Sequence, residues 1–140
     1  MKSLPRNTLG GALAVMMMVS PAAWAGSKSR TNVSIVFSGS GGSAQGLMGT
    51  ARSSTDTYQF LGCAASVGGT PGTGTSSAWM TCSARNSSNV TVSCTSGNPA
   101  FIEALHSLNS DSYISFSWDG AGTCTALTVG TYSQYETKTL

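Results

Sequence analysis

The four cysteines Cys63, Cys82, Cys94 and Cys124 constrain the fold of this 140-residue chain more than any other feature. No two of them have the C-x-x-C spacing of a zinc site, and the chain has a single histidine. An even number of cysteines in a small exported domain predicts disulfides, and four cysteines allow three connectivities. We therefore predict two disulfides, with no metal site and no cofactor.

Residues 1–25 have the features of a cleaved secretory signal peptide. Lys2 and Arg6 precede the apolar run Leu9–Val19, and the small-x-small motif AWA ends the segment. The run is too short to span a bilayer, and no later segment resembles a transmembrane helix. The sequence thus predicts bacterial export to the periplasm or the extracellular space.

Removal of the signal peptide leaves a single mature domain, 26–140, with flexible ends at 26–30 and 131–140. Without Lys2 and Arg6, the five remaining basic residues balance five acidic residues, so the formal charge falls from +2 to zero. A neutral domain lacks the basic footprint of a nucleic-acid-binding protein. We therefore expect no nucleic acid partner.

Alternation of apolar and polar residues, together with turn residues, predicts six strands. Their ranges are Thr31–Phe37, Thr57–Ser66, Ala78–Arg85, Asn89–Thr95, Asp111–Trp118 and Thr123–Gly130. Helical spacing predicts one helix between Ser43 and Arg52, and Asn98-Pro99 predicts the start of a second. This order predicts an α+β domain with a largely antiparallel sheet of about six strands and two helices on one face. The first helix is expected to connect two parallel strands.

The disulfide connectivity can be ranked from the predicted hairpin around Asn86-Ser87-Ser88. A three-residue loop places Cys82 opposite Val92, so Cys94 lies on a diagonal about 7–8 Å away, too far for an unstrained bridge. We therefore prefer Cys63–Cys82 with Cys94–Cys124. A five-residue loop would reverse this preference.

The last predicted hairpin connects its strands through Asp119–Gly122. In that register Ile114 lies opposite Leu127 and packs against the helices, while Cys124 lies on the other face. That other face is rich in hydroxyl groups, from Tyr113, Ser115, Ser117 and Thr128. It is either a candidate binding surface for a glycan or a protein, or simply a solvated surface. Either Cys124 forms its disulfide on the face opposite the helices, or a β-bulge breaks this register.

Two patterns that could support catalysis or nucleotide binding have simpler structural interpretations. The G-x-G-x-x-A motif at Gly39–Ala44 suits a dinucleotide site, with Asp56 downstream, but repeated βαβ units are lacking. Glu103 and His106 can pair on one helix face, without a nucleophile that the sequence singles out. We therefore predict no catalytic residues.

The segments GSAQGLMGTARSSTDTYQFLGC and DSYISFSWDGAGTC, with the cysteine-containing hairpin between them, resemble small exported bacterial proteins of unassigned function. The resemblance implies a family of whole domains and transfers no activity or site. We expect a non-enzymatic binding or assembly domain whose partner is a protein or a glycan. The alternatives are a secreted protease inhibitor that presents loop 67–77 and a small hydrolase that uses Glu103 and His106.

Overall fold

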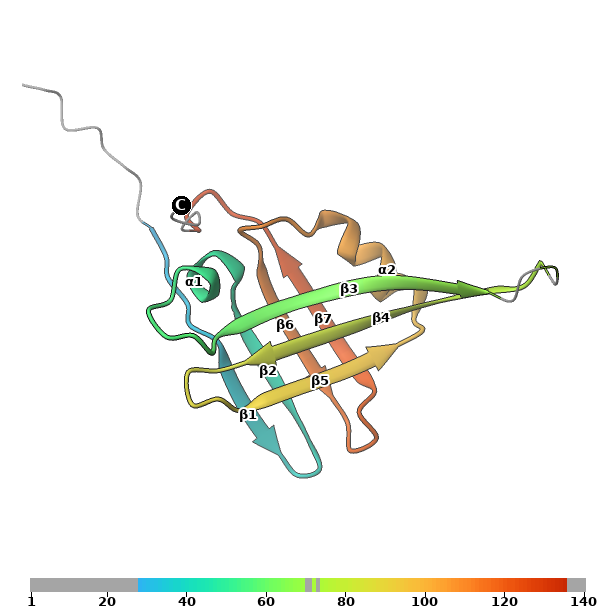
Figure 1. Ribbon diagram of the computed structural model, residues 1–140, viewed down its shortest axis with the longest axis horizontal. Coiled ribbons are helices and arrows are strands. Elements are labelled where there is room, and N and C mark those ends of the chain that lie inside the picture. The colour runs from blue at the N-terminus through green and yellow to red at the C-terminus, as the bar shows by residue number, and fades with distance from the viewer. Residues whose placement is uncertain (1–27, 70–71, 73, 136–140) are drawn as a thin grey trace, which may run out of the picture.

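The computed structural model describes residues 28–69, 72 and 74–135, which form two antiparallel β-sheets packed face to face (Figure 1). One sheet has the strand order β1-β2-β6-β7 and the other has the order β3-β4-β5. In Figure 1 the three-stranded sheet lies in front, and its strands cross those of the four-stranded sheet steeply. The strands are β1 (Ser34–Ser38), β2 (Gly41–Leu47), β3 (Phe60–Gly69), β4 (Ser76–Arg85), β5 (Thr91–Ser96), β6 (Tyr113–Trp118) and β7 (Cys124–Gly130).

The structure confirms the α+β class, the antiparallel pairing, the two helices and the two disulfides. It corrects the expectation of one sheet with both helices on one face. The inner face of the four-stranded sheet packs instead on the inner face of the three-stranded sheet, because each supplies buried side chains to a single core. Those residues include Ala44, Ile114 and Phe116 from the first sheet and Met80, Cys82 and Ala84 from the second.

Each helix contacts one strand of each sheet. Helix α1 (Met48–Arg52) contacts β2 and β3, and α2 (Pro99–Ala104) contacts β4 and β7. Helix α2 begins where the sequence predicts, because the Asn98 side chain accepts a hydrogen bond from the backbone N–H of Ala100 at 2.9 Å. The 3₁₀ turn Leu105–Ser107 continues it.

The predicted helix between Ser43 and Arg52 is wrong over its first half. Residues Gly41–Leu47 form the central strand β2, and only Met48–Arg52 are helical. Strand β2 follows β1 through a two-residue turn in which Gly39 has a φ of 59°. Strands β1 and β2 are therefore antiparallel neighbours. The expected parallel crossover from the first to the second predicted strand does not exist, because β1 and β3 belong to different sheets.

The glycines of β2 make room for large side chains of other strands. A Cβ atom on Gly42 would lie 2.6 Å from Cζ2 of the Trp118 indole, and one on Gly46 would lie 3.3 Å from a methyl group of Leu61. Only glycine permits such a close approach without displacing the neighbour. The G-x-G-x-x-A motif thus forms a turn and a buried strand, and the structure does not place it at the N-terminus of a helix.

The β4–β5 hairpin has a five-residue loop, Asn86–Val90, and not the three residues that we expected. Asn86 Oδ1 accepts hydrogen bonds from the backbone N–H groups of Ser88 and Val90, both at 3.0 Å, and Asn89 has a φ of 63°. The longer loop places Cys82 directly opposite Cys94. The geometric reason for our preferred connectivity was therefore wrong.

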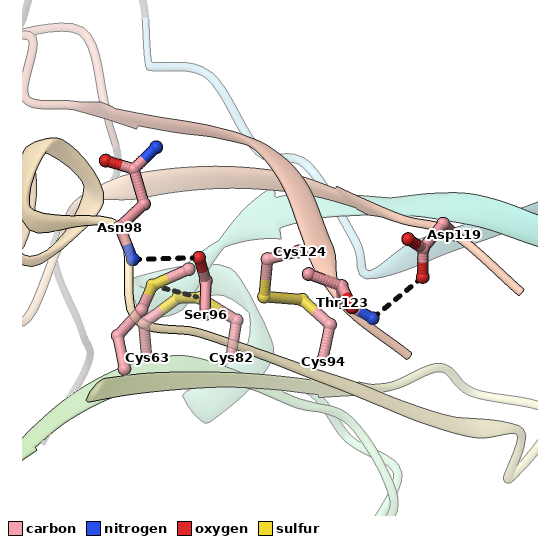
Figure 2. The surroundings of a disulfide bond; sticks show 9 residues. Cys63, Cys82, Cys94, Ser96, Asn98, Asp119, Thr123 and Cys124 are labelled. Atoms are coloured by element: carbon pink, nitrogen blue, oxygen red, sulfur yellow. Dashed lines mark hydrogen bonds between the residues drawn. A yellow bond between two sulfur atoms is a disulfide. The ribbon is translucent and has the colours of Figure 1, made fainter. Parts of the chain in front are cut away.

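The structure nevertheless pairs Cys63 with Cys82 and Cys94 with Cys124, which is the connectivity that we preferred. Cys82 lies between Cys63 and Cys94 in the three-stranded sheet, and its side chain bonds to Cys63. Cys94 of the edge strand β5 bonds to Cys124 of the edge strand β7, where the two sheets meet, as Figure 2 shows. One disulfide thus lies within a sheet, and the other joins the two sheets.

Cys124 faces the core because a β-bulge breaks the last hairpin. Ile114 lies opposite Val129, two residues away from the expected partner Leu127. Beyond Ser117 the register shifts, so that Trp118 lies opposite Cys124, which is 3% exposed. Asp119 Oδ1 stabilises the turn by accepting a hydrogen bond from the backbone N–H of Thr123 at 2.9 Å (Figure 2).

The β3–β4 hairpin extends beyond the sandwich (Figure 1). Val67 belongs to β3, and Ser76 and Ser77 belong to β4, so much of the expected loop 67–77 is a paired ladder. Outside the described residues are Thr70, Pro71 and Thr73 of that loop, the predicted signal peptide 1–25, Gly26, Ser27 and residues 136–140. Of the expected flexible ends, Ser29 forms a β-bridge with Tyr135.

Candidate functional site

The four residues that we predicted as a binding surface share one solvent-facing side of the four-stranded sheet. Tyr113, Ser115 and Ser117 alternate along β6, and Thr128 of β7 lies directly opposite Ser115. On the other side of β6, Gln45 of β2 is the partner of Ser115. We call the solvent-facing side of the four-stranded sheet the outer face, and it also includes Ser43 of β2 and Ala126 of β7.

The outer face is mainly polar, although the exposed Val36 of β1 lies opposite Ser43, and its strands carry no formal charge. Strands β1, β2, β6 and β7 contain no aspartate, glutamate, lysine, arginine or histidine. Gln45 and Thr128 are exposed, and the Tyr113 hydroxyl donates a 2.8 Å hydrogen bond to Oε1 of Gln45. The face therefore presents hydroxyl and amide groups at regular strand spacing, and these groups can donate or accept hydrogen bonds.

Three tyrosine rings gather at one end of the outer face. Tyr113 begins β6, and its ring centroid lies 6.2 Å from that of Tyr135. The Tyr135 ring lies 5.3 Å from that of Tyr132 in an edge-on arrangement, and Tyr132 is 63% exposed. We call Tyr113, Tyr132 and Tyr135 the tyrosine cluster. Desolvation, and then the proximity of the Tyr132 and Tyr113 phenols, raise the pKa of Tyr135 above 10.0.

Contacts from distant parts of the chain position the tyrosine cluster. The Asn109 side chain donates to Oγ1 of Thr131 at 3.3 Å, and the buried Ser112 hydroxyl lies 3.2 Å from the same oxygen. The backbone N–H of Ser29 donates to the Gln134 carbonyl at 2.7 Å. The sequence prediction missed this cluster because it assigned 131–140 to a flexible tail. The Y-x-x-Y spacing after the last strand was the available signal.

A polar hollow of about 440 Å³ lies on another part of the surface, and polar residues alone line it. Asp56 is one of the residues that line it. Its Oδ1 accepts hydrogen bonds from the backbone N–H groups of Tyr58 and Gln59, at 2.9 and 2.8 Å. Oδ2 accepts from the Gln59 side-chain amide at 2.6 Å, and Gln59 Oε1 accepts from the Val33 backbone at 2.8 Å. Asp56 therefore holds the α1–β3 connection to the segment before β1.

Replacing Asp56 by asparagine is expected to remove an acid-sensitive part of the stability. The hydrogen bonds from Gln59 side chain and backbone lower the pKa of Asp56 below 3.8. A lowered folded-state pKa gives stability that is complete above 3.8 and is lost as the pH falls through the folded value. Urea unfolding of wild type and Asp56→Asn should therefore differ at neutral pH and converge in acid. A difference that is constant across this range would contradict the assignment.

The other candidate groups form no larger cluster within the described part of the chain. His106 Nδ1 lies 3.4 Å from Glu103 Oε2, and both side chains are largely exposed. Among the described residues, no group of three or more His, Cys, Asp and Glu side chains could hold a metal ion, and both pairs of cysteines are oxidised. None of the helices described is long and apolar enough to cross a membrane.

Comparison with known proteins adds no relative on which to model the site. No family model, no curated protein and no solved structure matches the chain. The outer face and the tyrosine cluster therefore provide the basis for a functional proposal.

Proposed function

We propose that this protein is a small extracytoplasmic domain that binds or assembles with a partner through the outer face. The observation that carries the proposal is the alignment of Gln45, Ser115 and Thr128 across three neighbouring strands on a solvent-facing sheet. A flat array of hydrogen-bonding groups suits contact with an extended partner, whereas small-molecule and active sites are usually concave. The proposal is therefore for binding and not for catalysis.

The proposed location outside the cytoplasm rests on the signal-like segment 1–25 and on the disulfides. Structural disulfides persist in oxidising compartments such as the bacterial periplasm and the extracellular medium. The two disulfides of the structure fit such a compartment. The inhibitor and hydrolase alternatives gain no specific support, because part of 67–77 is a paired hairpin and the Glu103–His106 pair is exposed.

A lysine placed on the outer face should abolish partner capture. We expect tagged wild-type protein to enrich a partner from envelope or culture-medium fractions, and Thr128→Lys to lose it, because a charge on the neutral face must be desolvated on binding. The matched control is Ser93→Lys, since Ser93 is also exposed, lies on the middle of a strand and belongs to the other sheet. Equal capture by all three proteins would refute the outer face as the binding surface.

A further inference from the structure

We propose that the tyrosine cluster and the adjoining outer face bind a neutral glycan, an inference that rests on the proposed binding function. The aromatic rings would pack against the C–H faces of sugar rings, and the hydroxyl and amide groups would bond to sugar hydroxyls. Both kinds of group occur together at the β6 end where Tyr113 lies beside Gln45.

The rings offer an exposed apolar surface with polar rims. Tyr132 is 63% exposed, and its ring stands at 81° to that of Tyr135, which is tilted by 37° from Tyr113. A tyrosine ring presents an apolar face and a hydroxyl that stays in water, so it contacts an amphipathic ligand well. A sugar ring is such a ligand, because C–H groups cover its faces and hydroxyl groups surround its edge.

The polar part of the site continues along the strands. Next to Tyr113, Gln45 carries an amide that accepts from the Tyr113 hydroxyl and also has N–H donor groups. Ser115 and Thr128 follow, one step along β6 and β7 on the same face. A chain of sugar units that starts on the rings could therefore extend over these hydroxyl groups.

The charge distribution selects a neutral ligand. The four strands of the outer face contain no charged residue, so an anionic polymer that followed them would meet no lysine or arginine. Lys28 and Arg30 flank Ser29, which forms a β-bridge with Tyr135 of the cluster. Acidic glycans must therefore be included in the test.

The site is largely formed before a ligand binds. Gly130 lies opposite Tyr113, and a Cβ atom at this position would lie 3.2 Å from Cε2 of Tyr132. The absence of a side chain at Gly130 thus leaves room for the Tyr132 ring. The hydrogen bonds of the Thr131 hydroxyl hold the adjacent backbone. Preorganised rings lose little conformational entropy on binding.

The test is titration calorimetry of the mature protein with oligosaccharides of cellulose, chitin and starch, and with an acidic oligogalacturonate. We expect binding to at least one neutral oligosaccharide, weakened about tenfold (about 1.4 kcal/mol) or more by Tyr132→Ala, because aromatic residues often dominate the binding energy of an interface. Gly130→Val should weaken binding without removing a ring. Tyr58→Ala is the matched control, because Tyr58 is 45% exposed but lies on the α1–β3 connection.

Three results would overturn the glycan inference: no oligosaccharide binds, only the acidic one binds, or Tyr132→Ala and Tyr58→Ala bind as tightly as wild type. Circular dichroism and urea unfolding of each variant establish that it is folded. If no glycan binds but Thr128→Lys still loses a captured protein, the glycan inference fails and the broader proposal of a binding face stands. If capture is also insensitive to Thr128→Lys, both fail.

Discussion

Replacing both Cys94 and Cys124 by alanine is expected to lower the free energy of unfolding by about 3–4 kcal/mol. The disulfide closes a loop with a sequence separation of 30 residues, and both half-cystines are almost completely buried. Beside it, the two sheets are joined by a backbone hydrogen bond from Thr95 N–H to the Gly122 carbonyl at 3.1 Å. Urea unfolding of the oxidised wild type and the double variant measures the difference.

The matched control removes the other disulfide through Cys63→Ala and Cys82→Ala. Its sequence separation is 19 residues, so chain entropy alone predicts a loss only slightly smaller than that for Cys94–Cys124. The ten-residue ladder between β3 and β4 holds Cys63 beside Cys82 even without the bond, whereas Cys94 and Cys124 belong to different sheets. We therefore expect the inter-sheet variant to be clearly less stable than the control. The opposite order would show that the sandwich does not depend on this link.

Six of the seven strands could be predicted because alternation is a local signal that survives in each of them. Strand β2 was missed because its inward positions are Gly42, Ala44 and Gly46, which are too small to mark an apolar side. At Gly42 the Val36 carbonyl and the Trp118 indole occupy the space of a Cβ atom. At Gly46 the Val33 backbone and the Leu61 side chain do so. That requirement is tertiary and could not be deduced from the β2 segment.

The registers of the β4–β5 and β6–β7 hairpins could not be predicted from the sequence, because each depends on the conformation of its loop or bulge. The five-residue loop at Asn86–Val90 depends on side-chain hydrogen bonds and on the positive φ of Asn89, and either a three-residue or a five-residue loop keeps the same parity. The bulge before Trp118 was foreseen as an alternative, and it is the one that turns Cys124 into the core. Correct cysteine pairing therefore did not require a correct hairpin register.

Some residues of the candidate site are positioned by the local strand pattern, and others are positioned by tertiary contacts. Strand alternation places four side chains on one face: Tyr113, Ser115, Ser117 and Thr128. A shift of two residues in the register between β6 and β7 leaves them on that face. Tyr132, in contrast, is placed by bonds from Thr131 to residues about twenty positions away. The part of the site that depends on alternation, Tyr113 included, was predictable, and the positions of Tyr132 and Tyr135 were not.

Phe116→Ala is expected to destabilise the domain by about 3–5 kcal/mol, because it removes a large buried ring and leaves a cavity. Phe116 is 0% exposed and lies in the centre of β6, between Ala44 of β2 and Leu127 of β7. Against a net stability of about 5–15 kcal/mol for a typical domain, this loss is large. Urea unfolding of the oxidised proteins at neutral pH measures it.

Phe37→Ala is the control that separates burial from ring contact. The Phe37 and Phe116 rings lie 6.0 and 5.9 Å from the Trp118 ring, so each substitution removes one aromatic contact to the same indole. Phe37 is 62% exposed on the edge strand β1, and we expect its loss to cost about 0.5–1.5 kcal/mol, the usual worth of an aromatic pair. Equal losses for the two variants would mean that Phe116 is not at the centre of the core. If only Phe116→Ala lowers the free energy of unfolding, the stabilisation comes from packing between the sheets. Phe37 on the edge strand β1 would then have no role in stability.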